Sequence, residues 1–263
     1  MAERGWVEGR TIVFERRVAQ RRQDLPAVAR ELVESKVDLI VAMTTQSALA
    51  AKAATATMPI FFAVGGDPVR AGLVASMARP GGNLTGFTFG LFDEKLLEIL
   101  QQAVPKASRV MYPEARPTDA SVRAAQALGV RIFPFPVPGP EAFDAFFQEV
   151  RKVRPDGVVV PNIGWMAPHT ARIATELKAL RVPAIAIWTD FAKAGGLLAY
   201  GAVPDNKRAA DKIDALLRGA NPGEMAVEMP THFHLIVNVA TASYLGIEIP
   251  ESLLARADQV IHD

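Results

Sequence analysis

The sequence predicts an α/β fold of two doubly wound lobes, and three observations support this expectation. Short apolar runs that suit buried parallel strands alternate with amphipathic segments that suit helices. The alternation runs in two series, divided by the breaker at 80–83 (PGGN). The chain has 263 residues, enough for one large domain or two ordinary ones, and 50% of them are hydrophobic. We expect residues 1–86 with about 202–230 to form lobe one, and 87–201 with part of 231–263 to form lobe two.

The first series begins with a predicted strand at 11–15 (TIVFE). The helix that follows has Asp24 as a possible cap and Pro26 in its first turn. Its core stripe consists of Leu25, Val28, Ala29, Leu32 and Val33. The series continues with a strand at 37–42, an Ala-rich helix at 46–56, a strand at 59–64, a helix at 68–78 and a strand at 84–89.

The second series has the same alternation. Its predicted helices cover 93–103, 118–128, 141–153, 169–180 and 205–218, and its predicted strands cover 109–112, 131–135, 156–161, 183–188 and 196–201. Gly219 is the expected residue after the last of these helices. The tail adds a strand at 233–238, a short helix to Gly246 and a terminal helix that begins at Pro250.

Composition excludes several classes of protein. The formal charge of +1 lacks the basic excess expected of a protein that binds nucleic acid or an anionic membrane. Cysteine is absent, which rules out a thiol nucleophile, Cys-ligated zinc and disulfides. Residues 1–10 contain no basic region followed by an apolar one, so the sequence as written predicts a cytoplasmic product without a signal peptide.

Candidate binding residues of lobe one follow two predicted strands. In sheets of this kind, ligands bind at the carboxyl ends of the strands. Thr44, Thr45 and Gln46 begin a helix, where free N–H groups suit a carboxylate or other anion, although capping alone would also select hydroxyl residues. Asp67 follows two glycines and is suited to accept hydrogen bonds from an ammonium or hydroxyl group. It would equally cap a helix with Pro68 at the first position.

Lobe two offers a second set of candidates, again after predicted strands. A tryptophan beside a carboxylate suits a ligand with an apolar or cationic body, although the same tryptophans suit core or interface packing. Tyr200 lies near the expected second crossover between the lobes and either faces the cleft or only packs there. The candidates are Asn162, Trp165, Trp188, Asp190 and Tyr200.

Signatures of enzymes are scarce. The sequence contains no G-x-G-x-x-G, G-x-x-x-x-G-K-[ST] or G-x-S-x-G motif, so we expect no nucleotide cofactor and no serine hydrolase. His232 and His234 share a strand face but lack a third ligand, so a solvated face is favoured over a metal site. Asp67 and Asp190 would suit an acid/base pair across a cleft, and they would equally suit an amine or hydroxyls.

Several segments resemble the ABC-transporter substrate-binding family that includes tryptophan- and phenylalanine-binding lipoproteins. The resemblance is carried by 21–42, the 44–46 turn, 58–86 with its DPV…GLV…PGGN.TG pattern, 190–201 and 253–261. It implies a type I periplasmic-binding-protein fold, in which two Rossmann-like lobes close about a hinge on a small solute. It further implies a periplasmic, non-enzymatic protein that delivers an amino acid or other organic acid to an ABC permease. The ligand carboxylate would lie near Thr44–Gln46, with Asp67 nearby.

The resemblance also concerns the start of the chain. Members of the family usually have a signal peptide, a first strand and a first helix before a segment that corresponds to Gly5–Arg10. We therefore expect lobe one to lack its first strand and helix, which leaves 11–15 without its usual neighbour. Three alternatives stay open: a cytosolic ligand sensor with a protein partner, an enzyme that uses Asp67 and Asp190, and a truncated product without function.

Overall fold

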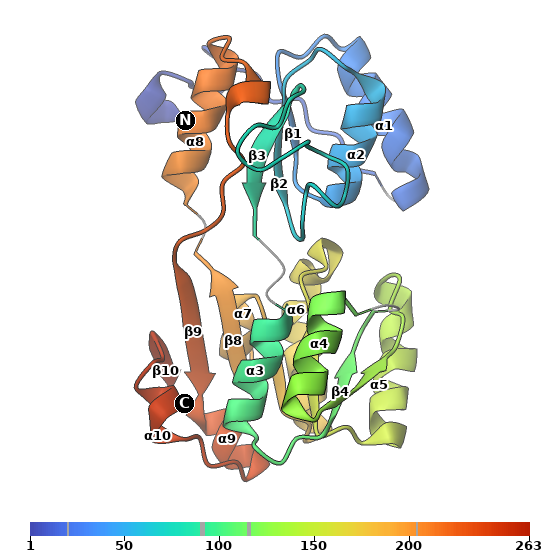
Figure 1. Cartoon of the computed structure of the whole chain (residues 1–263), viewed down its shortest axis with the longest axis vertical. Coiled ribbons are helices and arrows are strands. Elements are labelled where there is room, and N and C mark those ends of the chain that lie inside the picture. The colour runs from blue at the N-terminus through green and yellow to red at the C-terminus, as the bar shows by residue number, and fades with distance from the viewer. Residues whose placement is uncertain (20, 90–92, 115–116, 204) are drawn as a thin grey trace. The chain divides into compact units, whose positions relative to one another are not determined.

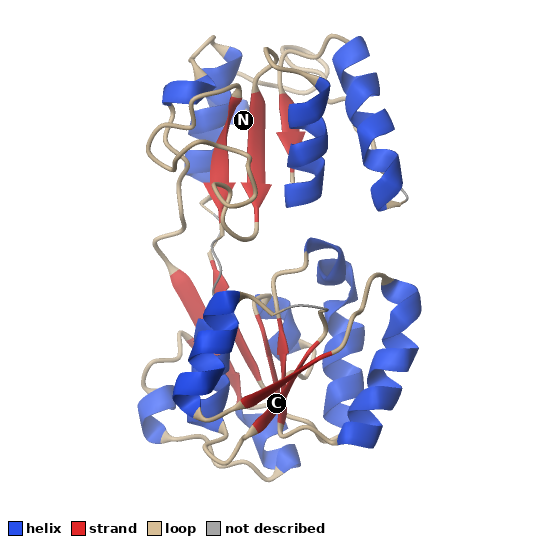
Figure 2. Ribbon diagram, turned by 45° about the vertical axis from the view of Figure 1, so that its right-hand side comes forward, coloured by secondary structure: helices blue, strands red, loops and turns tan. Residues whose placement is uncertain are grey.

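The computed structural model describes residues 1–19, 21–89, 93–114, 117–203 and 205–263. The chain forms two compact units (Figure 1). Unit one comprises Met1–Gly90 and Pro204–Pro230, and unit two comprises Leu91–Val203 and Thr231–Asp263. Each unit contains a sheet with helices on both faces, which confirms the predicted two-lobe α/β fold (Figure 2).

Unit one is built on a parallel sheet of strand order β1-β2-β3. Side chains alternate between its faces. Ile60 and Phe62 point into a core shared with α1 and α2, whereas Phe61 and Ala63 join a core shared with α8. The bounds are β1 (Ile40–Ala42), β2 (Ile60–Val64), β3 (Leu84–Thr88), α1 (Leu25–Glu34), α2 (Thr45–Ala54) and α8 (Asn206–Leu217), with short 3-10 helices η1 (Ala2–Arg4), η2 (Arg22–Asp24) and η5 (Pro222–Glu224).

The predicted strand at 11–15 is wrong. Ile12 makes a single bridge to Glu8, and residues 13–19 belong to no ladder. The side chains of Val13 and Phe14 are 78% and 45% exposed. An alternating apolar pattern becomes a strand only where a neighbouring strand pairs its backbone, and β1 pairs with β2 instead.

The predicted helix at 68–78 is also wrong, because this segment forms turns and bends. The Asp67 Oδ1 atom accepts the Val69 and Arg70 N–H groups, and the Leu73 N–H donates to the Pro68 carbonyl. Gly72 has a φ of 73°, in the left-handed region that ends a helical turn. The apolar residues Leu73 and Val74 of this segment pack into the core from a loop rather than from a helix.

Unit two contains a seven-stranded sheet of order β10-β9-β8-β7-β6-β4-β5. The strands from β5 to β8 are parallel and follow the 2-1-3-4-5 order of a doubly wound sheet, whereas β9 is antiparallel to β8. The strands are β4 (Arg109–Tyr112), β5 (Arg131–Pro134), β6 (Gly157–Val160), β7 (Ala184–Ala186), β8 (Leu198–Ala202), β9 (Phe233–Asn238) and β10 (Gln259–Ile261).

The helices of unit two cover both faces of this sheet. Val158 and Val160 pack with α5 and α6, whereas Val159 on the same strand packs with α3. The bounds are α3 (Asp93–Ala103), α4 (Asp119–Leu128), α5 (Phe143–Val153), α6 (Thr170–Ala179), α7 (Thr189–Lys193), α9 (Val239–Leu245) and α10 (Glu251–Leu254), with η3 (Pro140–Ala142) and η4 (Gly164–His169). Sequence reasoning missed α7 and β10, which are too short to show a period.

Candidate functional site

The loop after β1 in unit one leads directly into α2. Thr44 is the N-cap: its Oγ1 accepts the Ser47 N–H at 3.1 Å, and the Ser47 Oγ accepts the Thr44 N–H at 3.0 Å. This reciprocal capping box uses the Thr44 side chain for the helix itself. The N–H groups of Thr45 and Gln46 lie in the first turn of α2, so they have no intrahelical acceptor. These groups and the helix dipole favour an anion at this position.

Hydroxyl groups join this loop to its neighbours. The Thr45 Oγ1 donates to the Gly65 carbonyl at 3.1 Å, which ties the loop after β1 to the loop after β2. The Thr88 hydroxyl, at the end of β3, donates to the Gly66 carbonyl. Gly66 has a φ of 86°, a left-handed conformation that suits glycine. The carboxyl ends of all three strands of unit one are therefore linked through side chains.

Asp67 lies in this linked loop and is exposed, whereas Pro68 is buried. Its Oδ1 accepts the N–H groups of Val69 at 2.8 Å and of Arg70 at 3.2 Å, so the carboxylate caps a turn rather than the predicted helix. The Thr45–Gly65 bond holds the start of α2 against the loop in which Asp67 follows Gly65 by two residues. A positive helix end close to a carboxylate complements a zwitterion, the charge pattern of a free amino acid.

In unit two, the sheet register aligns several candidates at one edge. Val160 pairs with Ala186, and Ala186 pairs with Ala199. Asn162 and Trp188 each follow a paired residue by two positions, so both come at the carboxyl edge of the sheet. Both are half-buried, and Trp188 is the N-cap residue of α7.

Asp190 and Tyr200 have partners within unit two. The Asp190 side chain is 81% exposed and its Oδ1 lies 3.4 Å from the Lys193 Nζ. The Tyr200 ring stacks on Phe233 with centroids 5.5 Å apart. Asp67 and Asp190 belong to different units, and each has a local partner of its own.

Trp165 lies in η4, which follows β6. Its ring is 5.5 Å from the ring of Phe143 and 6.1 Å from that of His169, measured between centroids. Trp165 and His169 are half-buried, whereas Phe143 is buried. The indole is therefore held by other rings while part of it stays accessible.

The lowered pKa values lie away from these loops. Burial raises the pKa of Asp156, but hydrogen bonds from Ser108 and Arg109 outweigh it and hold the pKa below its usual value. The pKa of Asp214 on α8 is lowered chiefly by the hydrogen bond from the Trp6 indole, against a smaller effect of burial, with a further contribution from Arg218.

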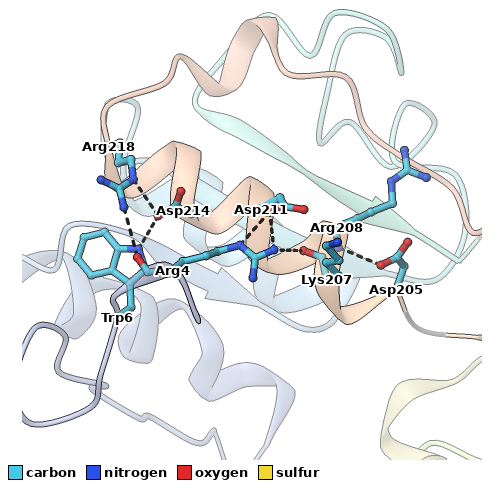
Figure 3. Close-up of polar contacts among 8 residues, drawn as sticks. All are labelled: Arg4, Trp6, Asp205, Lys207, Arg208, Asp211, Asp214 and Arg218. Carbon is cyan, nitrogen blue, oxygen red and sulfur yellow. Dashed lines mark hydrogen bonds and ion pairs between the residues drawn. The ribbon is translucent and has the colours of Figure 1, made fainter. Parts of the chain in front are cut away.

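Figure 3 shows the surroundings of Asp214. The Arg4 guanidinium bonds Asp211 and the Lys207 carbonyl, while the Asp205 side chain accepts the Arg208 N–H at the start of α8. These contacts attach residues 4–6 to α8, which is a structural role.

Comparison with known families assigns the chain. The family model described as "ABC transporter substrate binding protein" matches residues 1–261. The chain belongs to this family. The family consists of substrate-binding proteins rather than enzymes, as the sequence resemblance predicted.

Three known proteins are similar to this ABC transporter substrate-binding protein in sequence or in fold. It is 38% identical over 113 residues to a tyrosine-binding protein of Clostridioides difficile, a match that spans 42% of this chain and about a third (32%) of that protein. A conserved domain protein of Vibrio cholerae has a similar structure, with a TM-score of 0.89, 25% identity, and coverage of 98% of this chain and 90% of the other. The ABC domain of Streptococcus pneumonia in complex with L-Trp has a similar fold, with a TM-score of 0.85, 24% identity, and coverage of 99% and 92%.

Within the described residues of this substrate-binding protein, no three His, Cys, Asp or Glu side chains gather where they could hold a metal ion, and no helix has the length and hydrophobicity of a membrane span. His232 bonds the Thr231 hydroxyl, and His234 is exposed on β9.

Sequence reasoning named Thr45 but not its hydrogen bond to the loop of Gly65, and it gave Thr88 and His169 no role at the site. Thr88 is the last residue of β3, so its position at a strand end was a usable signal. The contact between His169 and Phe143 joins two separate segments, and no local pattern predicts it. Trp165, by contrast, lies four residues before His169 in η4, a spacing that is visible in the sequence.

Proposed function

We propose that this chain binds an aromatic amino acid and delivers it to the permease of an ABC importer, without turning it over. Family membership supports a small-molecule ligand and a permease partner. The named tyrosine-binding relative and the similar structure in complex with L-Trp support an aromatic amino acid as the ligand. A periplasmic location is part of this proposal and is testable by fractionation of the native host.

One observation in unit one carries the proposal. The Thr45–Gly65 hydrogen bond places the N-terminus of α2 beside the loop that contains Asp67. We propose that the first-turn N–H groups of Thr45 and Gln46, with the Thr44 cap, bind the ligand carboxylate. Asp67, which precedes Pro68 at the start of the turn, accepts hydrogen bonds from the ligand ammonium.

The loops of unit two supply the contacts to the ligand side chain in this proposal. Trp165 and Trp188 provide apolar area, and Asn162, Asp190 and Tyr200 orient the ligand. Asn162, Trp165, Trp188 and Asp190 follow strands at the carboxyl edge of the sheet, where ligands of such sheets bind. Tyr200 lies within β8, two residues before the strand ends.

The direct test is calorimetric titration with L-Trp, L-Tyr, L-Phe and L-Leu, accompanied by a thermal-shift screen. A ligand at 100 times its Kd adds about 2.7 kcal/mol to stability, which gives a clear shift in Tm. Chromatography of the eluted ligand should recover it unchanged. Absence of binding to L-Trp, L-Tyr and L-Phe would refute the proposal, and recovery of a modified ligand would favour an enzyme.

Two analogues test the zwitterion contacts. Tryptamine lacks the carboxylate and indole-3-propionate lacks the ammonium, so each should bind at least tenfold more weakly than L-Trp, a loss of about 1.4 kcal/mol. Equal affinity of the three compounds would contradict the assignment of α2 and Asp67.

A further inference from the structure

Three rings meet at the carboxyl edge of the unit-two sheet. Trp165 is the second residue of η4 after β6, His169 ends η4 at the start of α6, and Phe143 begins α5 after β5. Each residue therefore lies in a segment that leaves a strand at its carboxyl end. This is the edge at which open α/β sheets bind ligands.

The ring cluster of Trp165, His169 and Phe143 is closed, since each ring contacts the other two. Centroid separations are 5.5 Å for Phe143–Trp165, 5.4 Å for Phe143–His169 and 6.1 Å for Trp165–His169. Both contacts of His169 are edge-to-face, at interplanar angles of 65° and 64°, an arrangement that aromatic pairs prefer.

The backbone beneath the ring cluster is also fixed. The Met166 N–H donates to the Ile163 carbonyl at 2.8 Å, and the Thr170 hydroxyl donates to the Ala167 carbonyl at 2.6 Å. Met166 is fully buried. An accessible indole on a rigid backbone loses little rotamer freedom when a ligand packs against it, which favours binding.

We infer that the ring cluster binds the aromatic side chain of the ligand, and that His169 is a positioning residue that holds the Trp165 indole in its binding orientation. The inference rests on the proposed function and adds the element that selects aromatic over aliphatic amino acids. Phe143 is buried and packs against the indole, and the Arg172 guanidinium lies 5.4 Å from the centre of the Phe143 ring.

The test compares His169→Ala, His169→Phe and Trp165→Ala in the full chain by calorimetry with L-Trp, L-Tyr and L-Leu. Loss of the ring at 169 should lower the ratio of aromatic to leucine affinity at least fivefold, and His169→Phe should restore it because it keeps a ring edge against the indole. Trp165→Ala should lower the same ratio at least as much. The control is Tyr244→Ala, which removes an exposed aromatic ring from α9 in the same unit.

The outcomes separate this inference from the proposed function. If the wild-type chain binds no amino acid, the proposed function fails. If the wild-type chain binds aromatic amino acids and His169→Ala or Trp165→Ala keeps the wild-type ratio of aromatic to leucine affinity, the ring cluster does not bind the side chain of the ligand. A His169→Phe variant as impaired as His169→Ala would remove the positioning role, because a ring alone would then not suffice. Circular dichroism and Tm of each variant exclude loss of folding as the cause.

Discussion

Replacement of Asp67 by asparagine isolates the charge of this residue from its structural role. The Asp67 Oδ1 accepts two backbone N–H groups, from Val69 at 2.8 Å and Arg70 at 3.2 Å. An asparagine side-chain oxygen accepts the same bonds, so the turn should persist. Only the negative charge offered to the ligand ammonium is lost.

The expected effect follows from the lost charge. Asparagine still accepts a hydrogen bond from the ammonium, so the loss is the attraction between two unit charges, about 1 kcal/mol at roughly 4 Å in water and more where water is partly excluded. A loss of about 1–1.5 kcal/mol corresponds to roughly tenfold weaker binding of L-Tyr. The Tm should stay close to that of the wild type, because Asp67 is exposed.

The assay is a cycle of two proteins and two ligands measured by calorimetry. L-Tyr carries the ammonium, and 3-(4-hydroxyphenyl)propionate lacks it. Asp67→Asn should weaken L-Tyr only, so that the affinity gap between the two ligands narrows by about tenfold. An equal loss for both ligands, or unchanged affinity for L-Tyr, would refute the ammonium contact.

Three further predictions concern stability. Because the pKa of Asp156 is lowered in the folded state, its contribution to the free energy of unfolding is complete above the unfolded value of 3.8 and is lost as pH falls through the folded pKa. Asp156→Asn should therefore weaken the fall in stability at acid pH, measured by urea unfolding as a function of pH. An unchanged fall would contradict this role. A Cβ on Gly201 would overlap the Ile187 carbonyl, so Gly201→Ala should cost about 1–3 kcal/mol in denaturant unfolding, whereas Gly82→Ala, with open space around it, should cost less than about 0.5 kcal/mol. Trp6→Phe removes the 2.7 Å hydrogen bond to Asp214 and should speed hydrogen exchange of the backbone amides in residues 1–12. In the wild type the same loss of protection should follow as pH falls through the lowered pKa of Asp214. Equal protection of the wild type and Trp6→Phe at neutral pH would remove this role for Trp6.

Periodicity predicted most elements of the fold, because apolar side chains at the strand or helix period report local burial. It found β2 and β6, which are buried on both faces, and α5, whose four buried residues recur on one face. It failed at 11–15 and 68–78. Both segments contain the apolar residues that the prediction used. Residues 11–15 lack a partner strand for backbone pairing, and in 68–78 the left-handed Gly72 ends the helical turn.

The candidate site was predicted in the same partial way. Strand ends identified Thr45, Asp67 and Trp165 as loop residues at a ligand-binding edge. The two readings of Thr44, cap or ligand contact, were open in the sequence, and the structure shows the cap.

Local patterns in the sequence were enough to predict the alternation of strands and helices, the two-lobe class and the family, because these depend on motifs that stay close together along the chain. The contact of Thr45 with the Gly65 carbonyl and the packing of Trp165 on Phe143 appear only in the folded chain. These contacts join residues from separate segments, and their geometry depends on strand order and register, which no short stretch of sequence specifies.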